Sequence, residues 1–478
     1  MNNAHSPKNF RTASKQAIDN NNLRRILNHA LSTTLHKRGL AVSNLPQWEQ
    51  MRQTAHHIKK IVVENLDYYL AEFIKNAESK GTKIFYAEDS DDACNYILQV
   101  AREKNARLIV KSKSMVTEEI HLNDKLENAG IEVVETDLGE FIAQLNNQPP
   151  SHITAPIIHL SRQDVGRIYQ EKFQIPYTED ASLITAYTRK LLREKFFRAD
   201  MGISGANFAI ADTGSIVIVE NEGNVRMVTT APKVHIAVMG MEKFIRTITD
   251  LPLFLRLLSV SGTGQLLTNY VSIIHSARKP GEHDGPEELH IVILDNGRSG
   301  ILEDSVMREA LYCIRCGSCM NVCPVYSHVG GHAYGSVYPG PIGSVLTPLF
   351  QGLQAAEALP FASTLCGYCF ETCPVKIKIH HLLLHLRNRI AQEQLASFYE
   401  KIGFHIWLAI LKSSGIYRFT EKILRSLQNL IPGTKAPYIP EWSKTREFPR
   451  LAKKSFYQLS EKLGIREQFQ NKKDSSDE

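Results

Sequence analysis

The sequence predicts an α/β protein whose parallel-sheet domain is followed by a helical domain built around cysteines. Two observations support this fold class. From residue 83 to about residue 300, short apolar segments alternate with amphipathic ones, a pattern typical of parallel βαβ units. Seven of the eight cysteines then fall between Cys313 and Cys373, a density typical of a metal-binding module. The 478 residues suffice for about two to four domains of ordinary size.

The composition is that of a globular protein without a membrane span. Hydrophobic residues make up 43% and charged residues 22%, which excludes a disordered or fibrous chain. The longest apolar runs, such as 406–411, are far shorter than the roughly 18 residues that cross a bilayer, and residues 1–16 lack the apolar core of a secretion signal. We therefore expect a soluble cytoplasmic protein, in which clustered cysteines hold metal rather than disulfides.

Residues 1–75 should form an N-terminal helical arm. Leu23, Leu27 and Leu31 fall at helical spacing, and so do Ile58 and Val62 further along. The remaining positions are mostly polar, so we expect this arm to pack its apolar stripes on another surface.

Residues 76–300 should form the α/β domain. The expected strands are 84–87, 107–110, 131–134, 207–211, 215–220, 234–238 and 290–294. The expected helices are 91–103, 115–128, about 180–198 and one that begins at residue 241. Residues 279–286 are rich in turn formers and should be an exposed loop before the last strand. Cys94 lies in a helical pattern and should be a small buried residue.

Residues 301–390 should hold the metal, and 391–478 should be a basic helical extension. The interval 329–348 is rich in glycine and proline, so we expect no regular helix there, only turns that wrap the metal sites. Prolines within 431–440 should break the C-terminal helices.

The net charge of +6 is concentrated in residues 376–425, where nine lysines and arginines stand against three glutamates. No nucleic-acid-reading motif accompanies this basic face, so we expect no nucleic-acid partner. One expectation is that this face docks a partner or an anionic membrane surface. The alternative is that it is ordinary solvated surface.

The first cysteine motif has the spacing C-x2-C-x2-C-x3-C-P. It consists of Cys313, Cys316, Cys319 and Cys323, followed by Pro324. In such a run, three thiolates bind one iron–sulfur cube and the fourth ligates a second cluster. A structural zinc site would instead pair two C-x2-C knuckles, so the motif favours iron–sulfur chemistry.

The second motif repeats only the last three cysteines of the first and has Ser363 where a fourth would stand. Exchange of the last ligands between the motifs predicts two sets. Cluster 1 would be held by Cys313, Cys316, Cys319 and Cys373, and cluster 2 by Cys323, Cys366 and Cys369. Cluster 2 is then either [3Fe-4S], or [4Fe-4S] with a fourth ligand from Ser363, His328, His332 or water.

Three polar loops are further candidates for ligand binding. Residues 111–114 lie between an expected strand and helix, where they could hold a carboxylate or phosphate, or simply cap the helix. Glycines in 202–207 and 212–214 would let a ligand approach the backbone, or form tight turns. Motifs for flavin, nicotinamide or nucleotide binding are not found, so the catalytic residues stay unknown.

The order of these features resembles the lactate utilization protein B family. The resemblance rests on Lys111-Ser-Lys-Ser-Met115, on Glu135-Thr-Asp-Leu-Gly139, on the segment 202–214, and on the two cysteine motifs that follow. It implies a LUD domain similar to the ribose-phosphate isomerase and CoA-transferase superfamily, and two [4Fe-4S] clusters on the cysteine sets given above. It also implies an electron-transfer subunit in oxidation of L-lactate to pyruvate. The implied partners are a cysteine-rich subunit and a smaller LUD-domain subunit.

Two other function classes stay open. The α/β domain could itself be an enzyme that oxidises a 2-hydroxy acid, or the chain could be an iron–sulfur interaction or sensing module without turnover. Bleaching of the clusters by lactate separates the classes. The isolated enzyme would bleach, an electron carrier would bleach only with its partners, and a sensor would not bleach at all.

Overall fold

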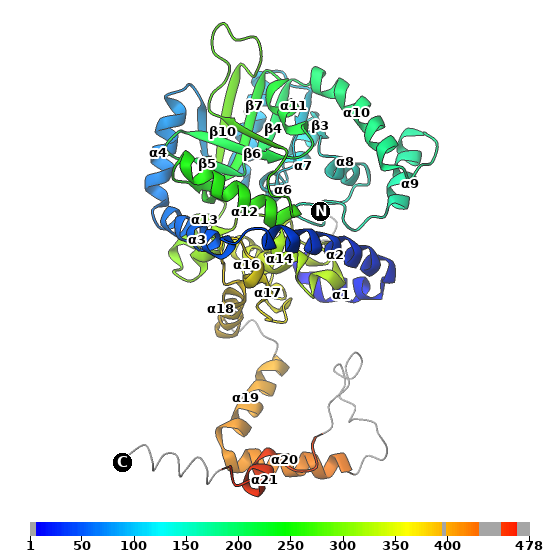
Figure 1. Cartoon of the computed structure of the whole chain (residues 1–478), viewed down its shortest axis with the longest axis vertical. Coiled ribbons are helices and arrows are strands. Elements are labelled where there is room, and N and C mark those ends of the chain that lie inside the picture. Colours follow the sequence, from blue (N-terminus) through cyan, green and yellow to red (C-terminus); the bar gives the residue numbers. More distant parts are fainter. Residues whose placement is uncertain (1–5, 394–397, 430–450, 466–478) are drawn as a thin grey trace. The chain divides into compact units, whose positions relative to one another are not determined.

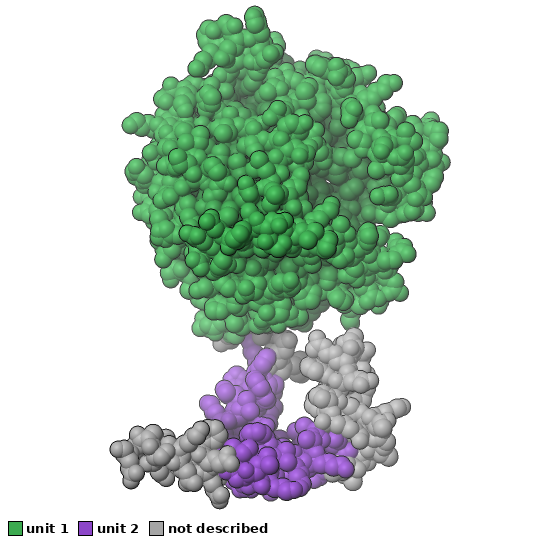
Figure 2. Space-filling model, viewed as in Figure 1, with its two compact units in different colours: residues 1–395 green, residues 396–478 purple. Residues whose placement is uncertain are grey.

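The computed structural model describes residues 6–393, 398–429 and 451–465. The chain divides into two compact units, Met1–Leu395 and Ala396–Glu478, coloured green and purple in Figure 2. Each unit is described by itself. The finer division at residues 75, 300 and 390 remains a prediction.

A six-stranded parallel sheet forms the centre of the first unit (Figure 1), as predicted. Its strand order is β1-β10-β7-β4-β2-β3, and every neighbouring pair is parallel. The strands are β1 (Lys83–Ala87), β2 (Leu108–Lys111), β3 (Glu132–Glu135), β4 (Met201–Gly205), β7 (Val234–Gly240) and β10 (Glu288–Leu294). β4 was not expected, because its glycines predicted a loop at 202–205.

Helices cover both faces of this sheet, as parallel strands require. One face packs on α5 (Ser90–Glu103), α6 (Met115–Glu119) and α7 (Leu122–Asn128). The other packs on α8 (Leu138–Leu145), α10 (Ala181–Arg198) and α11 (Asn224–Thr230), with α9 (Arg162–Phe173) behind α8. Asp89 starts α5 by accepting hydrogen bonds from the backbone of Asp91 and Asp92. The predicted helix 115–128 is broken in two where His121 adopts a φ of 51°.

A second, mixed sheet of four strands was not predicted as a sheet, although two of its strands were expected at 207–211 and 215–220. Its order is β8-β5-β6-β9, with β5 antiparallel to β6 and parallel to β8. The strands are β5 (Phe208–Ile210), β6 (Ser215–Glu220), β8 (Phe244–Ile245) and β9 (Tyr270–Ile274). The helix predicted from residue 241 is wrong, because a 3-10 turn, η2 (Met241–Lys243), leads into β8. The helix α12 (Leu251–Thr263) begins later, with a proline in its first turn.

The N-terminal helices pack on the rest of their own unit. They are α1 (Phe10–Asp19), α2 (Asn21–Ser43), α3 (Trp48–Glu64) and α4 (Leu66–Glu78). Leu27, Val62 and Phe73 are fully buried, and the Phe73 ring lies 5.1 Å from the Phe244 ring of the second sheet. The surface expected to receive this arm is therefore part of the same chain.

Short helices carry the cysteine region. They are α13 (Arg298–Glu303), η4 (Met307–Tyr312), α14 (Ser318–Asn321), α15 (Tyr326–Val329), α16 (Gly340–Gln351), α17 (Tyr368–Thr372) and α18 (Ile379–Gln392). The prediction that 329–348 contains no regular helix is wrong at α16. Pro341 lies in the first turn, where backbone N–H groups have no helical partner, and Pro348 lies three residues before the end. Burial of the apolar residues between the two prolines stabilises the helix.

The second unit contains α19 (Phe398–Lys412), α20 (Ser414–Asn429) and α21 (Phe456–Lys462). Phe404 and Trp407 are 65% and 58% exposed. The predicted helix breaks within 431–440 lie outside the described residues. Among the helices of the described ranges, none is long and apolar enough to cross a membrane.

Candidate metal centre

The two cysteine loops share one backbone conformation. In the first loop, Arg315 and Gly317 flank Cys316 with φ values of 58° and 76°. In the second, Leu365 and Gly367 show 56° and 80° at the equivalent places. A non-glycine residue in this left-handed region is strained, so its occurrence at matching positions marks a specific loop geometry. The spacing match predicted from the sequence is thus a structural repeat.

The structure brings the cysteines together in two adjoining sets. Four of them line one cavity, together with apolar side chains such as Ile314 and Ile342: Cys313, Cys316, Cys319 and Cys373. The other three, Cys323, Cys366 and Cys369, interact electrostatically with one another. Cys369 also interacts with Cys319 and Cys373, so the two sets lie side by side.

The donor set fits iron–sulfur clusters. Burial raises the pKa of the Cys373 thiol to about 11 and that of Cys369 to about 12. Thiolates in such surroundings need a strong positive charge nearby, which iron supplies. Backbone N–H groups also point at sulfur: those of Arg315 and Ile377 lie 3.4 Å from the Sγ atoms of Cys313 and Cys373. Such bonds stabilise thiolate character and adjust the potential of a cluster.

Ser363 occupies in the second cysteine loop the place that Cys313 has in the first. Its Oγ accepts a hydrogen bond from the backbone of Leu365 at 3.1 Å, as Cys313 Sγ accepts one from Arg315. The two histidine candidates are differently placed. Nε2 of His332 lies 2.8 Å from the carbonyl of Pro149, and His328 is exposed. Local geometry therefore favours Ser363 over either histidine as the counterpart of Cys313.

Two arginines of the N-terminal helices hold the second cysteine loop. Nε of Arg52 donates to the carbonyl of Cys373 at 2.9 Å, and its Nη2 donates to that of Phe370 at 2.8 Å. Nη2 of Arg38 donates to the carbonyl of Thr372 at 3.2 Å. The sequence analysis missed both residues. A signal was present, because Arg52 lies at helical spacing from Ala55 on a buried stripe where a cation needs an acceptor.

A second cavity of about 270 Å³ lies at the carboxyl ends of the parallel strands. Ser112 and Ser114 after β2, and Asn207 after β4, line it, so two of the three predicted ligand loops meet there. The third loop does not, because Gly214 packs against the backbone of Ala77. Ser114 also caps α6, as the alternative interpretation of 111–114 had it.

Two cations that the sequence analysis did not single out line the same cavity. Lys243 follows β7, and Arg315 belongs to the first cysteine loop and also lines the cysteine cavity. Arg315 joins a buried chain of ion pairs centred on the Glu242 carboxylate. Nη2 of Arg315 lies 3.3 Å from this carboxylate, and Nε of Arg298 lies 2.6 Å from it. Arg298 continues to Glu119 at 2.9 Å, so the chain connects the α/β region to the cysteine region. Arg298 and Arg315 hold the pKa of the Glu242 carboxyl down to about 2.

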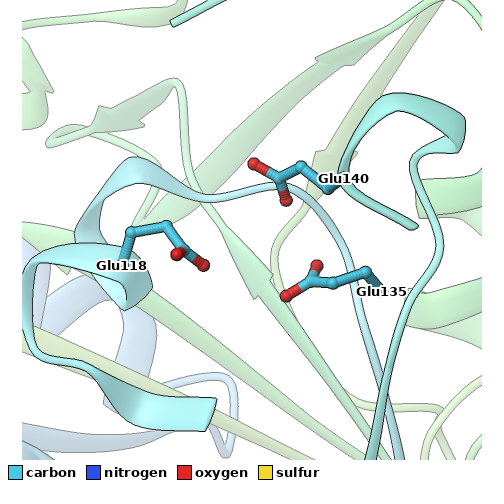
Figure 3. A group of neighbouring side chains, drawn as sticks. All are labelled: Glu118, Glu135 and Glu140. Atoms are coloured by element: carbon cyan, nitrogen blue, oxygen red, sulfur yellow. The ribbon is translucent and has the colours of Figure 1, made fainter. Parts of the chain in front are cut away.

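A buried acidic cluster lies beside the strands β2 and β3. Glu118, Glu135 and Glu140 point toward one another (Figure 3) and have the geometry of a cation site. Nζ of Lys111 lies 2.9 Å from Glu118 and 2.8 Å from Glu135, so an ammonium group already supplies the positive charge. Burial and the charge of Glu135 raise the pKa of the Glu140 carboxyl, which favours its protonated form. We assign no metal to this cluster.

Cys94, the one cysteine outside the motifs, is fully buried in α5, as predicted. Its Sγ lies 3.4 Å from the carbonyl of Ile120, and burial raises the pKa of its thiol to about 11. The loop at 279–286 contains no helix or strand and is largely exposed, also as predicted.

Three family models match the chain in sequence order. They are the LUD domain over residues 70–294, the 4Fe-4S dicluster domain over 309–377, and the C-terminal domain of lactate utilisation protein B over 386–465. The dicluster match and the cysteine motifs identify an iron–sulfur protein with two clusters.

Curated relatives match nearly end to end. Lactate utilization protein B of Bacillus cytotoxicus is 43% identical over 94% of this chain and 96% of its own length. Those of Bacillus licheniformis and Bacillus subtilis are 43% and 42% identical, each over 94% of this chain and 95% of their own. A crystal structure of a DUF162 family protein from Deinococcus radiodurans covers 48% of this chain and 98% of its own, at 14% identity. Its TM-score of 0.28 is too low to support an argument about the fold. On the strength of the curated relatives, the chain belongs to the lactate utilization protein B family.

Proposed function

We propose that the chain is an iron–sulfur electron-transfer subunit in the oxidation of L-lactate to pyruvate. The observation that carries this proposal is the pair of adjoining cysteine sets, held in one packed core behind a LUD domain. An iron–sulfur cluster accepts and releases one electron at a time, so two neighbouring clusters form a path for electrons. The name of the relatives, lactate utilization protein B, supports lactate as the source of electrons.

Cluster 1 is assigned to Cys313, Cys316, Cys319 and Cys373, and cluster 2 to Cys323, Cys366 and Cys369. In support, the first set lines one cavity and the second interacts as a group. We further propose Ser363 as the side chain that approaches the fourth iron of cluster 2, because its Oγ has the hydrogen-bonding position of Cys313 Sγ. A hydroxyl is a poorer iron ligand than a thiolate, so this iron is the labile one.

Electrons would enter at cluster 1 and leave at cluster 2. The thiols of cluster 1 are buried or nearly so, and one wall of their cavity adjoins the α/β region. Cys366 of cluster 2 is exposed, and Phe361 and Tyr368, five residues before and two residues after it, are 51% and 53% exposed. An exposed cluster edge with aromatic neighbours is suited to contact with another redox protein.

The proposed partners are a cysteine-rich subunit and a smaller LUD-domain subunit, in the cytoplasm. The basic residues of 376–425 are proposed to help a partner or an anionic membrane surface dock, although they span both units of the chain. The finer fold assignment, a LUD domain similar to the ribose-phosphate isomerase and CoA-transferase superfamily with a helical C-terminal extension, belongs to the same proposal.

Anaerobic purification followed by EPR and titration with L-lactate tests the function. We expect L-lactate to reduce both clusters when the two partners are present and neither cluster in the isolated chain. Cys366→Ser should abolish transfer to an external acceptor. Cys94→Ser is the matched control, because Cys94 lies outside both sets and a serine hydroxyl can keep its hydrogen bond. Reduction of the isolated chain would instead favour an enzyme, and no reduction with partners would favour a sensing module.

A further inference from the structure

We propose that the cavity at the carboxyl ends of the parallel strands is a binding site for a small organic carboxylate, with Lys243 and Arg315 as its cations. The assignment of the ligand to 2-hydroxy and 2-oxo acids rests on the proposed function. The existence of the anion site does not, because it follows from the cavity and its charges.

The cavity lies where open parallel sheets bind ligands, beyond the carboxyl ends of their strands. Its volume of about 270 Å³ is close to the lower end of the range for small-molecule sites, roughly 300 Å³. The helix α12 forms one wall and lies against the cysteine loop. A Cβ on Gly262 would stand 3.2 Å from the carbonyl oxygen of Cys316. A ligand in this cavity is thus separated from the first cysteine set by a single layer of residues.

The cations Lys113, Lys243 and Arg315 line this cavity, and the two buried ones, Lys243 and Arg315, carry donors without protein acceptors. Nε and Nη1 of Arg315 are buried and form no hydrogen bond. Lys243 is 8% exposed, and no hydrogen bond or ion pair joins its Nζ to the described residues, although the neighbouring Glu242 carboxylate and the Cys313 thiol act on it electrostatically. A buried charge without a hydrogen-bonded counter-charge is costly, and an anion in the cavity would supply the acceptors.

Of Arg315 and Lys243, Lys243 is the cation that lines the larger cavity and not the cysteine cavity, although the Cys313 thiol also acts on it electrostatically. Arg315 lines both cavities, so its free donors can also serve the sulfurs of the cysteine set. Lys243 lines only the larger cavity, on the side of the α/β region. The test is therefore built on Lys243.

The remaining lining selects the kind of anion. Carboxylates also line the cavity, among them Asp137, which caps α8, and Glu220, which accepts hydrogen bonds from the backbone of Val225 and Arg226 in the first turn of α11. These negative groups would repel a polyphosphate or a dinucleotide. Ser259 contributes a buried hydroxyl without a partner, and Asn207 an amide, for an oxygen next to a carboxylate. A single carboxylate with a neighbouring hydroxyl or carbonyl fits this lining.

Calorimetric titration of the anaerobic holoprotein with L-lactate and with pyruvate tests the site. We expect binding of at least one of them at concentrations up to about 10 mM, and no binding of 1,2-propanediol, which lacks the carboxylate. Lys243→Gln should weaken binding at least about tenfold, since it removes a charge-assisted contact. Lys190→Gln on the exposed face of α10 is the matched control and should leave the affinity unchanged.

Ser259→Ala guards against the chance that the buried Lys243→Gln variant does not fold. It removes a hydroxyl that has no partner in the protein, so it should leave thermal unfolding unchanged and weaken binding several-fold. Equal affinity in the parent and in all variants, equal binding of 1,2-propanediol, or no binding to the parent would each overturn the proposal. Reduction of the clusters by L-lactate with the partners present would still support the proposed function in those cases, so the two proposals fail separately.

Discussion

Arg52 should be essential for the retention of cluster 1, although it lies more than 300 residues from the loop that it holds. Arg52 is 5% exposed, and its guanidinium donates to the carbonyl groups of Cys373 and Phe370. In Arg52→Gln, the shorter side chain cannot reach both acceptors. The loop that carries Cys373 would then open more often and expose iron to solvent.

The size of the effect follows from these two bonds. A hydrogen bond from a charged donor contributes about 1.5 to 3 kcal/mol, so the loss of two costs about 3 to 6 kcal/mol. The ion pair of Arg52 with the half-exposed Glu49 adds under about 1 kcal/mol. If the free energy of opening the loop falls by only the lower value, about 3 kcal/mol, the open state becomes about 100-fold more populated.

Release of iron to a chelator, followed anaerobically, measures this opening directly. We expect Arg52→Gln to release the iron of cluster 1 about 100-fold faster than the parent. Arg25→Gln is the control, because Arg25 is exposed and its Nη2 donates only to Asn22 at 3.0 Å. Release rates for Arg52→Gln that match those of Arg25→Gln would refute the view that α3 holds the second cysteine loop.

Three further outcomes are expected. Cys373→Ser should damage cluster 1, to which its ligand is assigned, and an EPR spectrum that loses only the signal of cluster 2 would show that the ligands do not cross over. Ser363→Cys should stabilise cluster 2 against oxidative loss of iron and lower its potential, and a parent protein that shows no [3Fe-4S] signal on oxidation, with no gain in the variant, would contradict this. Burial lowers the pKa of His235 to about 3, so the folded state keeps this histidine neutral while the unfolded chain protonates it below about pH 6.5. Stability should therefore fall as the pH drops from 6.5, by about 2 kcal/mol at pH 5 for this one group, and denaturant unfolding of His235→Asn should lack that share of the loss.

The sequence predicted those parts of the fold in which local patterns and tertiary packing agree. The strands 84–87 and 215–220 were predicted nearly to the residue, because apolar runs between turn formers are unambiguous when they are short. β4 was missed because Gly202 and Gly205 are poor strand formers, yet a Cβ at Gly202 would stand 1.9 Å from the carbonyl of Val228. Close packing of α11 on the strand requires glycine there. That requirement comes from the tertiary structure and cannot be seen in one sequence.

The candidate site was predictable to the extent that its chemistry is local. Cysteine spacing alone predicted the seven cysteines that the structure gathers in two adjoining sets, since ligands two and three residues apart on a turn reach the same cluster. The cations around the clusters were not predictable. Arg52 reaches the second cysteine loop from α3, and Lys243 reaches the larger cavity from η2, so their roles depend on which segments the fold brings together. The one signal for these cations in the sequence was a charged residue at a position where the apolar pattern predicts burial.

The most direct test of the account is the reduction of the two clusters by L-lactate, monitored by EPR on the anaerobic protein with and without its proposed partners. The account predicts that L-lactate produces the EPR signals of both reduced clusters only when the partners are present. Electrons then leave through the cluster of Cys366. Reduction of the isolated chain by L-lactate, or clusters that stay oxidised in the complete system, would contradict it.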